Sequence, residues 1–170
     1  MQGFFGFIGK AKTALRLPAR EKVWFCLAYP LSGFVRLAIL ILPFRAIASV
    51  LGRPTDTDSS SIVPISETSQ DLARRLGRIC SLVARYTPWE SKCLVQAVAV
   101  AVGLRFYGIP GIVYLGVVNS DGPLKAHAWV KVGDLVVSGR EGHRAFTVIA
   151  AYGVALNRSR NTNVLPTQNI

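Results

Sequence analysis

The sequence predicts an α+β fold in which a central helix packs on an antiparallel sheet, preceded by an apolar helical region. Apolar side chains recur at helical spacing from residue 69 and become almost continuous between residues 94 and 104. After Pro110 the apolar spacing drops to two, which is typical of strands that bury one face. A chain of 170 residues, 51% of them hydrophobic, has room and material for one such domain.

A first helix of this domain is expected from residue 69 onward. Thr68 or Ser69, with Asp71 just inside the first turn, is suited to cap its amino terminus. Cys80 falls on the apolar stripe of this helix. It is therefore expected to be a buried thiol without chemistry.

Three strands and a short fourth one are expected after the central helix. Gly and Asn-Ser-Asp-Gly turn signals separate the first three of them. The four segments are Ile112 to Val118, Ala126 to Val132, Leu135 to Ser138 and Phe146 to Ala150.

This arrangement divides the chain into four parts. The α+β domain is assigned to residues 69–156, and a polar, flexible tail to residues 157–170. Residues 53–68, rich in Ser, Thr, Asp and Pro, are expected to be a linker. Residues 1–52 are expected to be helical and apolar.

The apolar region at residues 1–51 has three possible roles. An amphipathic surface helix is expected over residues 1–22, and a helical hairpin with one broad apolar face after it. That face is expected to pack on the rest of the protein. Docking of a partner protein and membrane association are the alternatives. A transmembrane helix is not expected, because Pro30, Arg36 and Pro43 interrupt the apolar run.

Composition limits the function classes. Lysine and arginine outnumber acidic residues 20 to 9, which favours anionic partners, but the basic residues are scattered and form no aromatic-interleaved stripe, so nucleic-acid binding is not expected. The three cysteines and two histidines have no metal-ligand spacing, so neither a metal nor another cofactor is expected. A free thiol and the lack of a secretory signal suggest a cytoplasmic protein.

Cys93 and His127 are the residues expected to carry chemistry. The helix of small apolar residues is expected to begin at or near Cys93, because Pro88 restricts the chain before it to extended conformations. A helix amino terminus favours a thiolate, and Lys92 adds a positive charge. His127 lies between two alanines on a predicted strand, which leaves its ring accessible. A thiol nucleophile needs such a base within hydrogen-bond reach.

Four segments of the chain form a specific combination. They are Ser91-Lys-Cys93-Leu-Val-Gln96-Ala, Tyr107-Gly-Ile-Pro110, Leu124-Lys-Ala-His127-Ala-Trp129-Val and Phe146-Thr-Val-Ile149-Ala. Together they resemble the carboxy-terminal protease domain of lasso-peptide B proteins, over about residues 70 to 153. These proteins belong to the transglutaminase-like superfamily, so the resemblance implies a transglutaminase-like, papain-like core.

The resemblance also implies an activity and partners. It implies a cysteine protease, a leader peptidase that removes the leader from a ribosomally made lasso precursor peptide through a thioester, before a lasso cyclase closes the ring. Residues 1–68 lack the strands of the recognition domain that fused members carry. The chain therefore resembles the split form (B2), which acts with a separate leader-recognition protein (B1).

The third catalytic residue of the family is an acid after the histidine, and here the sequence departs from the pattern. A two-residue turn before Leu135 would place His127 opposite Arg140, so Glu141 is the closest acid in register. Glu141 is therefore favoured over Asp134, which lies roughly 20 Å along the strand. A backbone carbonyl or Asn119 is a third means of orienting the ring.

An oxyanion site needs the Cys93 N–H, and Gln96 or Trp89 is the candidate for a side-chain donor. Trp89 is equally suited to cover the core, and Gln96 to satisfy a buried polar group. His143 is expected on the surface. Two other functions stay open: acyl transfer to an amine, and a non-catalytic binding module of the same fold.

Overall fold

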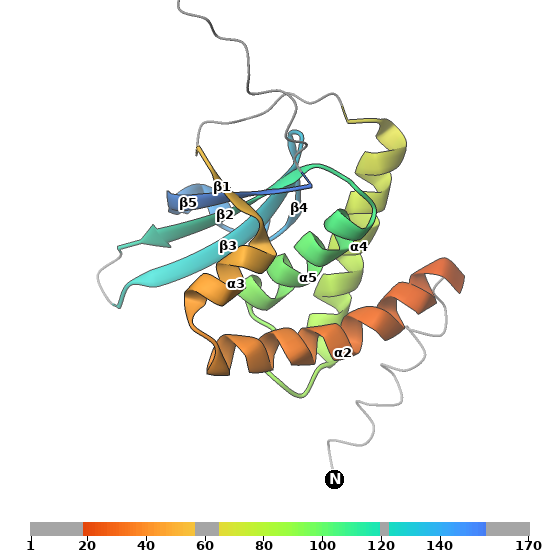
Figure 1. Ribbon diagram of the computed structural model, residues 1–170, viewed down its shortest axis with the longest axis horizontal. Helices are drawn as coiled ribbons and strands as arrows, with labels where there is room; N and C mark the ends of the chain where they lie inside the picture. The colour runs from red at the N-terminus through yellow and green to blue at the C-terminus, as the bar shows by residue number, and fades with distance from the viewer. Residues whose placement is uncertain (1–18, 57–64, 120–122, 156–170) are drawn as a thin grey trace, which may run out of the picture.

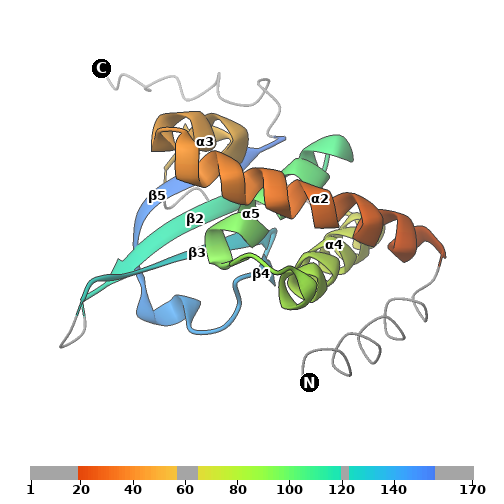
Figure 2. The ribbon, with the colours of Figure 1, turned by 90° about the horizontal axis from the view of Figure 1, so that it is seen from below.

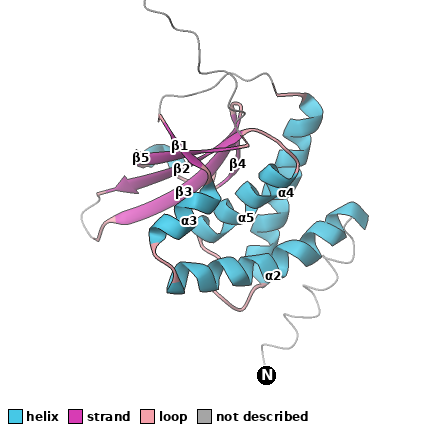
Figure 3. Ribbon diagram, viewed as in Figure 1, coloured by secondary structure: helices cyan, strands magenta, loops and turns pink. Residues whose placement is uncertain are grey.

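The computed structural model describes residues 19–56, 65–119 and 123–155. Its helices are α2 (Ala19–Ile41), α3 (Phe44–Leu51), α4 (Glu67–Tyr86), α5 (Cys93–Phe106) and a single 3-10 turn, η1 (His143–Ala145). Its strands are β1 (Arg53–Thr55), β2 (Gly111–Val118), β3 (Lys125–Val132), β4 (Leu135–Ser138) and β5 (Thr147–Val154). Figures 1 and 3 show the α-helices gathered on one side of the sheet, which confirms the predicted α+β fold.

The sheet is antiparallel, with strand order β1-β5-β2-β3-β4. Among the strands, α5 packs mainly on β3, and α2 crosses both α4 and α5 on the side away from the sheet (Figure 1). Because α5 lies between these layers, almost all its side chains are buried, and only small or apolar residues fit there. The run after Cys93 supplies them.

The two faces of the sheet carry different side chains. On β3, Ala128, Val130 and Val132 point into the core shared with the helices. Trp129, between them in sequence, belongs to a second cluster with Tyr114 on the opposite face. Side chains alternate along a strand, so His127 shares the face of Trp129. The η1 turn lies on this same side of the sheet (Figure 2).

Some predicted boundaries were wrong. The cap of α4 is Ser66, whose hydroxyl accepts from the Ser69 N–H, and not Thr68 or Ser69. Residues 53–55, expected in the linker, form an edge strand on β5. The predicted Phe146–Ala150 strand extends to Val154, because β5 pairs with β2 along its whole length past a bulge.

The described part of the amino-terminal region, residues 19–51, is largely helical, as expected, but α2 packs with only one face. Ala28 and Val35 of α2 are buried, whereas Phe34 is 70% exposed. The linker residues 57–64, the amphipathic segment at residues 1–18 and the tail from residue 156 onward lie outside the described residues.

Candidate active site

Cys93 is the first residue of α5, as the sequence predicted. Its thiol is free and half-buried. The preceding residue, Lys92, has extended backbone angles and makes no side-chain cap on the helix. The first N–H groups of α5 are therefore left without a side-chain cap and give the thiol a partly positive environment.

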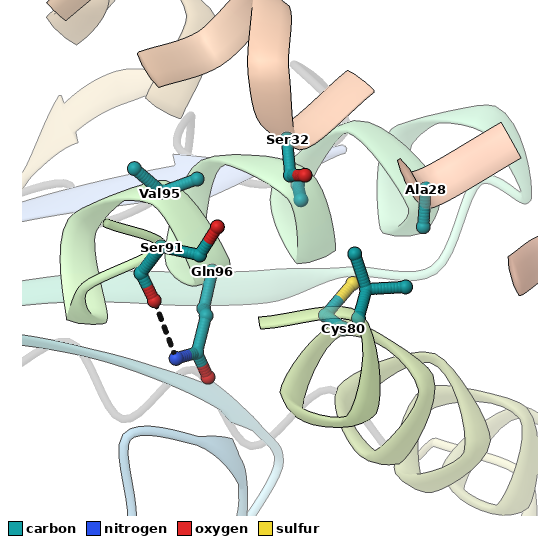
Figure 4. A pocket seen from close by; sticks show the side chains of 8 residues that line it. Ala28, Ser32, Cys80, Ser91, Val95 and Gln96 are labelled. Carbon is teal, nitrogen blue, oxygen red and sulfur yellow. Dashed lines mark hydrogen bonds between the residues drawn. The ribbon is translucent and has the colours of Figure 1, made fainter. Parts of the chain in front are cut away.

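The segment that leads to Cys93 is held by hydrogen bonds to α4 and α5. The Gln96 Nε2 donates to the Ser91 carbonyl at 2.9 Å (Figure 4). The Ser81 hydroxyl of α4 lies 3.2 Å from Gln96 Oε1. The Thr87 and Ser91 hydroxyls lie 2.9 Å apart. Both ends of the Gln96 amide are thus engaged in holding the chain, so in this conformation Gln96 is not directed at an oxyanion.

The same segment is joined to α2. Trp89 Nε1 donates to the Ser32 hydroxyl at 3.3 Å, and its ring packs edge-on to Tyr29. The Arg36 guanidinium lies 3.2 Å from the Glu90 carboxylate. Trp89 therefore anchors the loop to α2, and its N–H is not free for an oxyanion.

Cys80 differs sharply from Cys93. It is buried on α4 and lines a small pocket between α2, α4 and α5 (Figure 4). Burial raises the pKa of the Cys80 thiol to about 12, because desolvation disfavours the thiolate. The prediction that Cys80 is buried in the core is confirmed.

His127 is oriented by a backbone carbonyl. Its Nε2 lies 2.8 Å from the Gly139 oxygen. A carbonyl can only accept, so Nε2 carries the proton and Nδ1 is the basic nitrogen of the neutral ring. The ring stacks on Trp129, with centroids 5.9 Å apart, and contacts Phe146. This is the third alternative that the sequence left open.

Neither predicted acid forms an ion pair or a hydrogen bond with the imidazole. The pairs nearest the turn keep the expected register, but a bulge between Val130 and Lys131 shifts it, and β4 ends at Ser138. The expected pairing of His127 with Arg140 does not form. Glu141 and Asp134 are both exposed, and among the described residues no carboxylate forms an ion pair with His127.

Cys93 and His127 lie toward the same end of the sheet. A Cβ built on Gly111 would contact both Leu104 and Val132, so the carboxy-terminal ends of α5 and β3 are neighbours. Along α5, the distance from Leu104 back to Cys93 is about 16 Å at the rise of an α-helix. The strand from Val132 rises about 17 Å back to His127. Because α5 and β3 run in roughly the same direction (Figure 1), the two candidate residues lie at about the same level along the sheet.

The two side chains do not touch, however. Cys93 packs against the core between α5 and the sheet, whereas the His127 ring stacks on the cluster of the opposite face. No hydrogen bond joins the Cys93 sulfur to the imidazole within the part of the chain that the structure describes. Proton transfer between them requires a local rearrangement.

Comparison with known proteins supplies the family. A model of the transglutaminase-like superfamily matches residues 38–151, two thirds of the chain. The chain belongs to the transglutaminase-like superfamily. Neither the curated proteins nor the solved structures gave a match. The superfamily includes cysteine proteases and acyltransferases. Its matched region begins inside α2 and includes α3 and β1, upstream of the domain boundary expected at residue 69.

Sequence reasoning did not identify Gly139 as the acceptor for His127. The feature of the sequence that could have pointed to Gly139 is a glycine directly after a predicted strand. In the structure Gly139 has a φ of 68°, a conformation that glycine adopts readily. The contact between Trp129 and the imidazole could have been predicted from the sequence, because residues two apart on a strand share a face. The described residues contain no group of three or more His, Cys, Asp or Glu suited to a metal ion.

Proposed function

We propose that this chain is a cysteine peptidase that removes the leader from a lasso precursor peptide, with Cys93 as nucleophile and His127 as base. The observation that carries the proposal is that the Cys93 thiol and the His127 imidazole lie toward the same end of the sheet. A half-buried thiol at an uncapped helix start lies at the same end of the sheet as an imidazole with a fixed Nε2–H and a free Nδ1.

In the proposed cycle, Nδ1 of His127 takes the proton of the Cys93 thiol, and the thiolate attacks the carbonyl at the leader–core junction. The imidazolium then protonates the departing core amine, and water hydrolyses the thioester to free the leader. Catalytic hydrogen bonds are often long in free enzymes and tighten when substrate binds. In the free chain the His127 ring lies on the face of the sheet opposite the core that Cys93 contacts, so the cycle also requires the ring to change its position before it can take the thiol proton.

The motif resemblance supports the lasso precursor as substrate. It also supports a separate leader-recognition protein and a lasso cyclase as partners, and a cytoplasmic setting. The apolar, helical character of residues 19–51 supports the split form, because a recognition domain would need strands there.

Mass spectrometry of a lasso precursor incubated with the full chain and a recognition protein tests the proposal. The wild-type chain is expected to release the leader, and Cys93→Ala to lose this activity. Cys80→Ala is the matched control, because Cys80 is buried and its thiol is protonated at neutral pH. Cleavage by Cys93→Ala at the normal rate would exclude this nucleophile.

Thiol reactivity tests the Cys–His pair without a precursor. In a Cys26→Ser background, alkylation of Cys93 by iodoacetamide at neutral pH is expected to slow roughly tenfold or more when His127 is changed to Ala, because the base that withdraws the thiol proton is lost. Equal rates would show that the imidazole does not reach the sulfur.

Acyl transfer is the second candidate, since the superfamily includes acyltransferases and the two reactions share a thioester. A labelled primary amine added to the cleavage reaction separates them. Leader release without label supports hydrolysis, whereas labelled leader supports transfer to the amine.

A further inference from the structure

The outward face of α2 carries no charge along most of its length. After Lys22, every exposed residue of this helix is uncharged, and most are large and apolar. The apolar ones are Val23, Leu27, Pro30, Phe34, Leu37, Leu40 and Ile41, of which the large side chains are 52–70% exposed. We call these residues the α2 stripe.

The stripe is continuous because its members recur at helical spacing. Leu27, Phe34 and Ile41 are seven residues apart, and Leu37 falls between the last two, so they share one side of the helix. Exposed Phe44 at the start of α3 extends the apolar surface. Single exposed apolar residues are common, but a contiguous row of this length marks an interaction surface.

The helix is long and apolar enough to cross a membrane, and only 17% of its apolar window is buried. Its opposite face, however, is bonded to the domain. Glu21 forms an ion pair with Arg78 at 2.6 Å, and Ser32 accepts from Trp89. Arg36 pairs with Glu90. These polar contacts hold one side of α2 on the protein, so the stripe can lie on a bilayer but the helix cannot span it.

Charge around the stripe favours an anionic surface. Lys22 and Arg45 flank its two ends and are exposed. Of the nearby acids, Glu21 is buried against Arg78, and Glu90 is neutralised by two cations. The whole chain carries a formal charge of +11. An apolar face with basic flanks is the composition of helices that bind in the headgroup region of anionic membranes.

An aromatic group adjoins the amino-terminal end of α2, at the edge of the face that packs on the protein. Phe106 is 76% exposed, and its ring packs edge-on to Trp24. Trp24 also donates to the Tyr107 hydroxyl at 2.6 Å. Arg105 beside them is exposed. Amphipathic aromatic rings with adjacent cations are enriched at membrane interfaces.

We propose that the α2 stripe binds the surface of an anionic lipid bilayer, with α2 lying in the plane of the membrane and the α+β domain facing the water. This binding is independent of peptide cleavage, because the stripe faces away from the sheet that carries His127 (Figure 2).

Flotation of the full chain with lipid vesicles tests the inference. Binding is expected to vesicles of phosphatidylcholine mixed with phosphatidylglycerol, and to be much weaker with phosphatidylcholine alone. The stripe variant Leu27→Gln, Phe34→Gln, Ile41→Gln is expected to lower the partition coefficient at least about tenfold, because three apolar side chains no longer enter the lipid. The matched control is Leu124→Gln with Ile149→Gln, two residues that are 66% and 61% exposed away from α2. It is expected to bind as the wild type does.

A second measurement, the maleimide reactivity of Cys26, tests the inference without any change to the stripe. In a Cys93→Ser background, Cys26 on the exposed side of α2 is the reactive thiol, since Cys80 is buried. Anionic vesicles are expected to slow its reaction with a water-soluble maleimide. Unchanged maleimide reactivity, or equal binding by the stripe variant and the wild type, would overturn the proposal. If the wild type bound no vesicles but formed a dimer, and the stripe variant were a monomer, the stripe would be assigned to contact with a second copy of the chain instead. Cleavage by the stripe variant in the absence of lipid separates this result from any failure of the proposed peptidase.

Discussion

The two loops that present the candidate catalytic groups are built in different ways. The loop before Cys93 is held by side chains from three helices, with Gln96, Ser81 and Ser32 among the contacts. The loop after β4 holds His127 through a single backbone carbonyl, that of Gly139. The position of Cys93 thus depends on side-chain hydrogen bonds, whereas the orientation of His127 depends on the backbone conformation at Gly139.

This difference predicts how strongly substitutions on each side of the site should affect cleavage. On the nucleophile side, removing one side chain leaves other contacts in place, so effects should be graded. On the base side, no side chain holds the ring Nε2, and only a change in backbone conformation removes its acceptor. The predictions below test this contrast, beginning with the largest expected effect.

Replacing His127 by Ala is expected to lower the cleavage rate by roughly 10²- to 10⁴-fold, the usual contribution of a general base. Glu141→Gln and Asp134→Asn are expected to leave the rate within about twofold, because neither carboxylate pairs with the imidazole. The measurement is kcat/KM with the precursor. If Glu141→Gln were as damaging as His127→Ala, an acid would orient the ring and the carbonyl would not.

Gly139→Ala is expected to displace the carbonyl that holds His127. A Cβ there would collide with the Ala128 oxygen, and the φ of 68° strains any other residue. Gly142→Ala is the matched control, since it has a similar φ of 70° but open space around the added carbon. The control should lose only about 1–2 kcal/mol of stability from its backbone conformation. Urea unfolding and cleavage rates of both variants separate backbone strain from loss of the acceptor. Equal effects of the two variants would argue against the carbonyl as the orienting group.

Gln96→Leu is expected to destabilise the fold by about 1–3 kcal/mol, because it leaves the Ser81 hydroxyl and the Ser91 carbonyl without this partner. It should also reduce cleavage, since the segment before Cys93 loses its link to α5. Gln70→Leu offers a close control. Gln70 Nε2 also donates to a carbonyl five residues earlier, that of Ile65, but far from Cys93 in sequence. Thermal unfolding should show a loss in both variants, and a cleavage assay a loss only in the first.

Arg36→Gln is expected to have the smallest effect. Its ion pair with Glu90 is partly exposed, and such pairs contribute about 0–1 kcal/mol. The cleavage rate should stay within about twofold, because Trp89 still joins the loop to α2. A large loss of activity, with unfolding unchanged, would mean that this ion pair positions the nucleophile directly.

Local signals predicted the elements well. Pro88 and the apolar run after it located the start of α5 at Cys93, because a proline limits the residue before it and small apolar side chains suit a buried helix. Period-two spacing located β2, β3 and β4 to within a residue. The β4 bulge was not predictable, since an inserted residue leaves the apolar alternation intact on either side.

By itself, the sequence determined the fold class, the helix start at Cys93, the strand that carries His127 and the burial of Cys80. Each of these follows from local spacing or from the apolar character of one helix face. Only the tertiary structure decided that β1 joins the sheet edge, that Gly139 and not an acid holds the imidazole, and that one face of α2 stays uncovered. These features depend on register and on packing between distant segments: β4 ends at Ser138, so the chain leaves the sheet before it reaches Glu141.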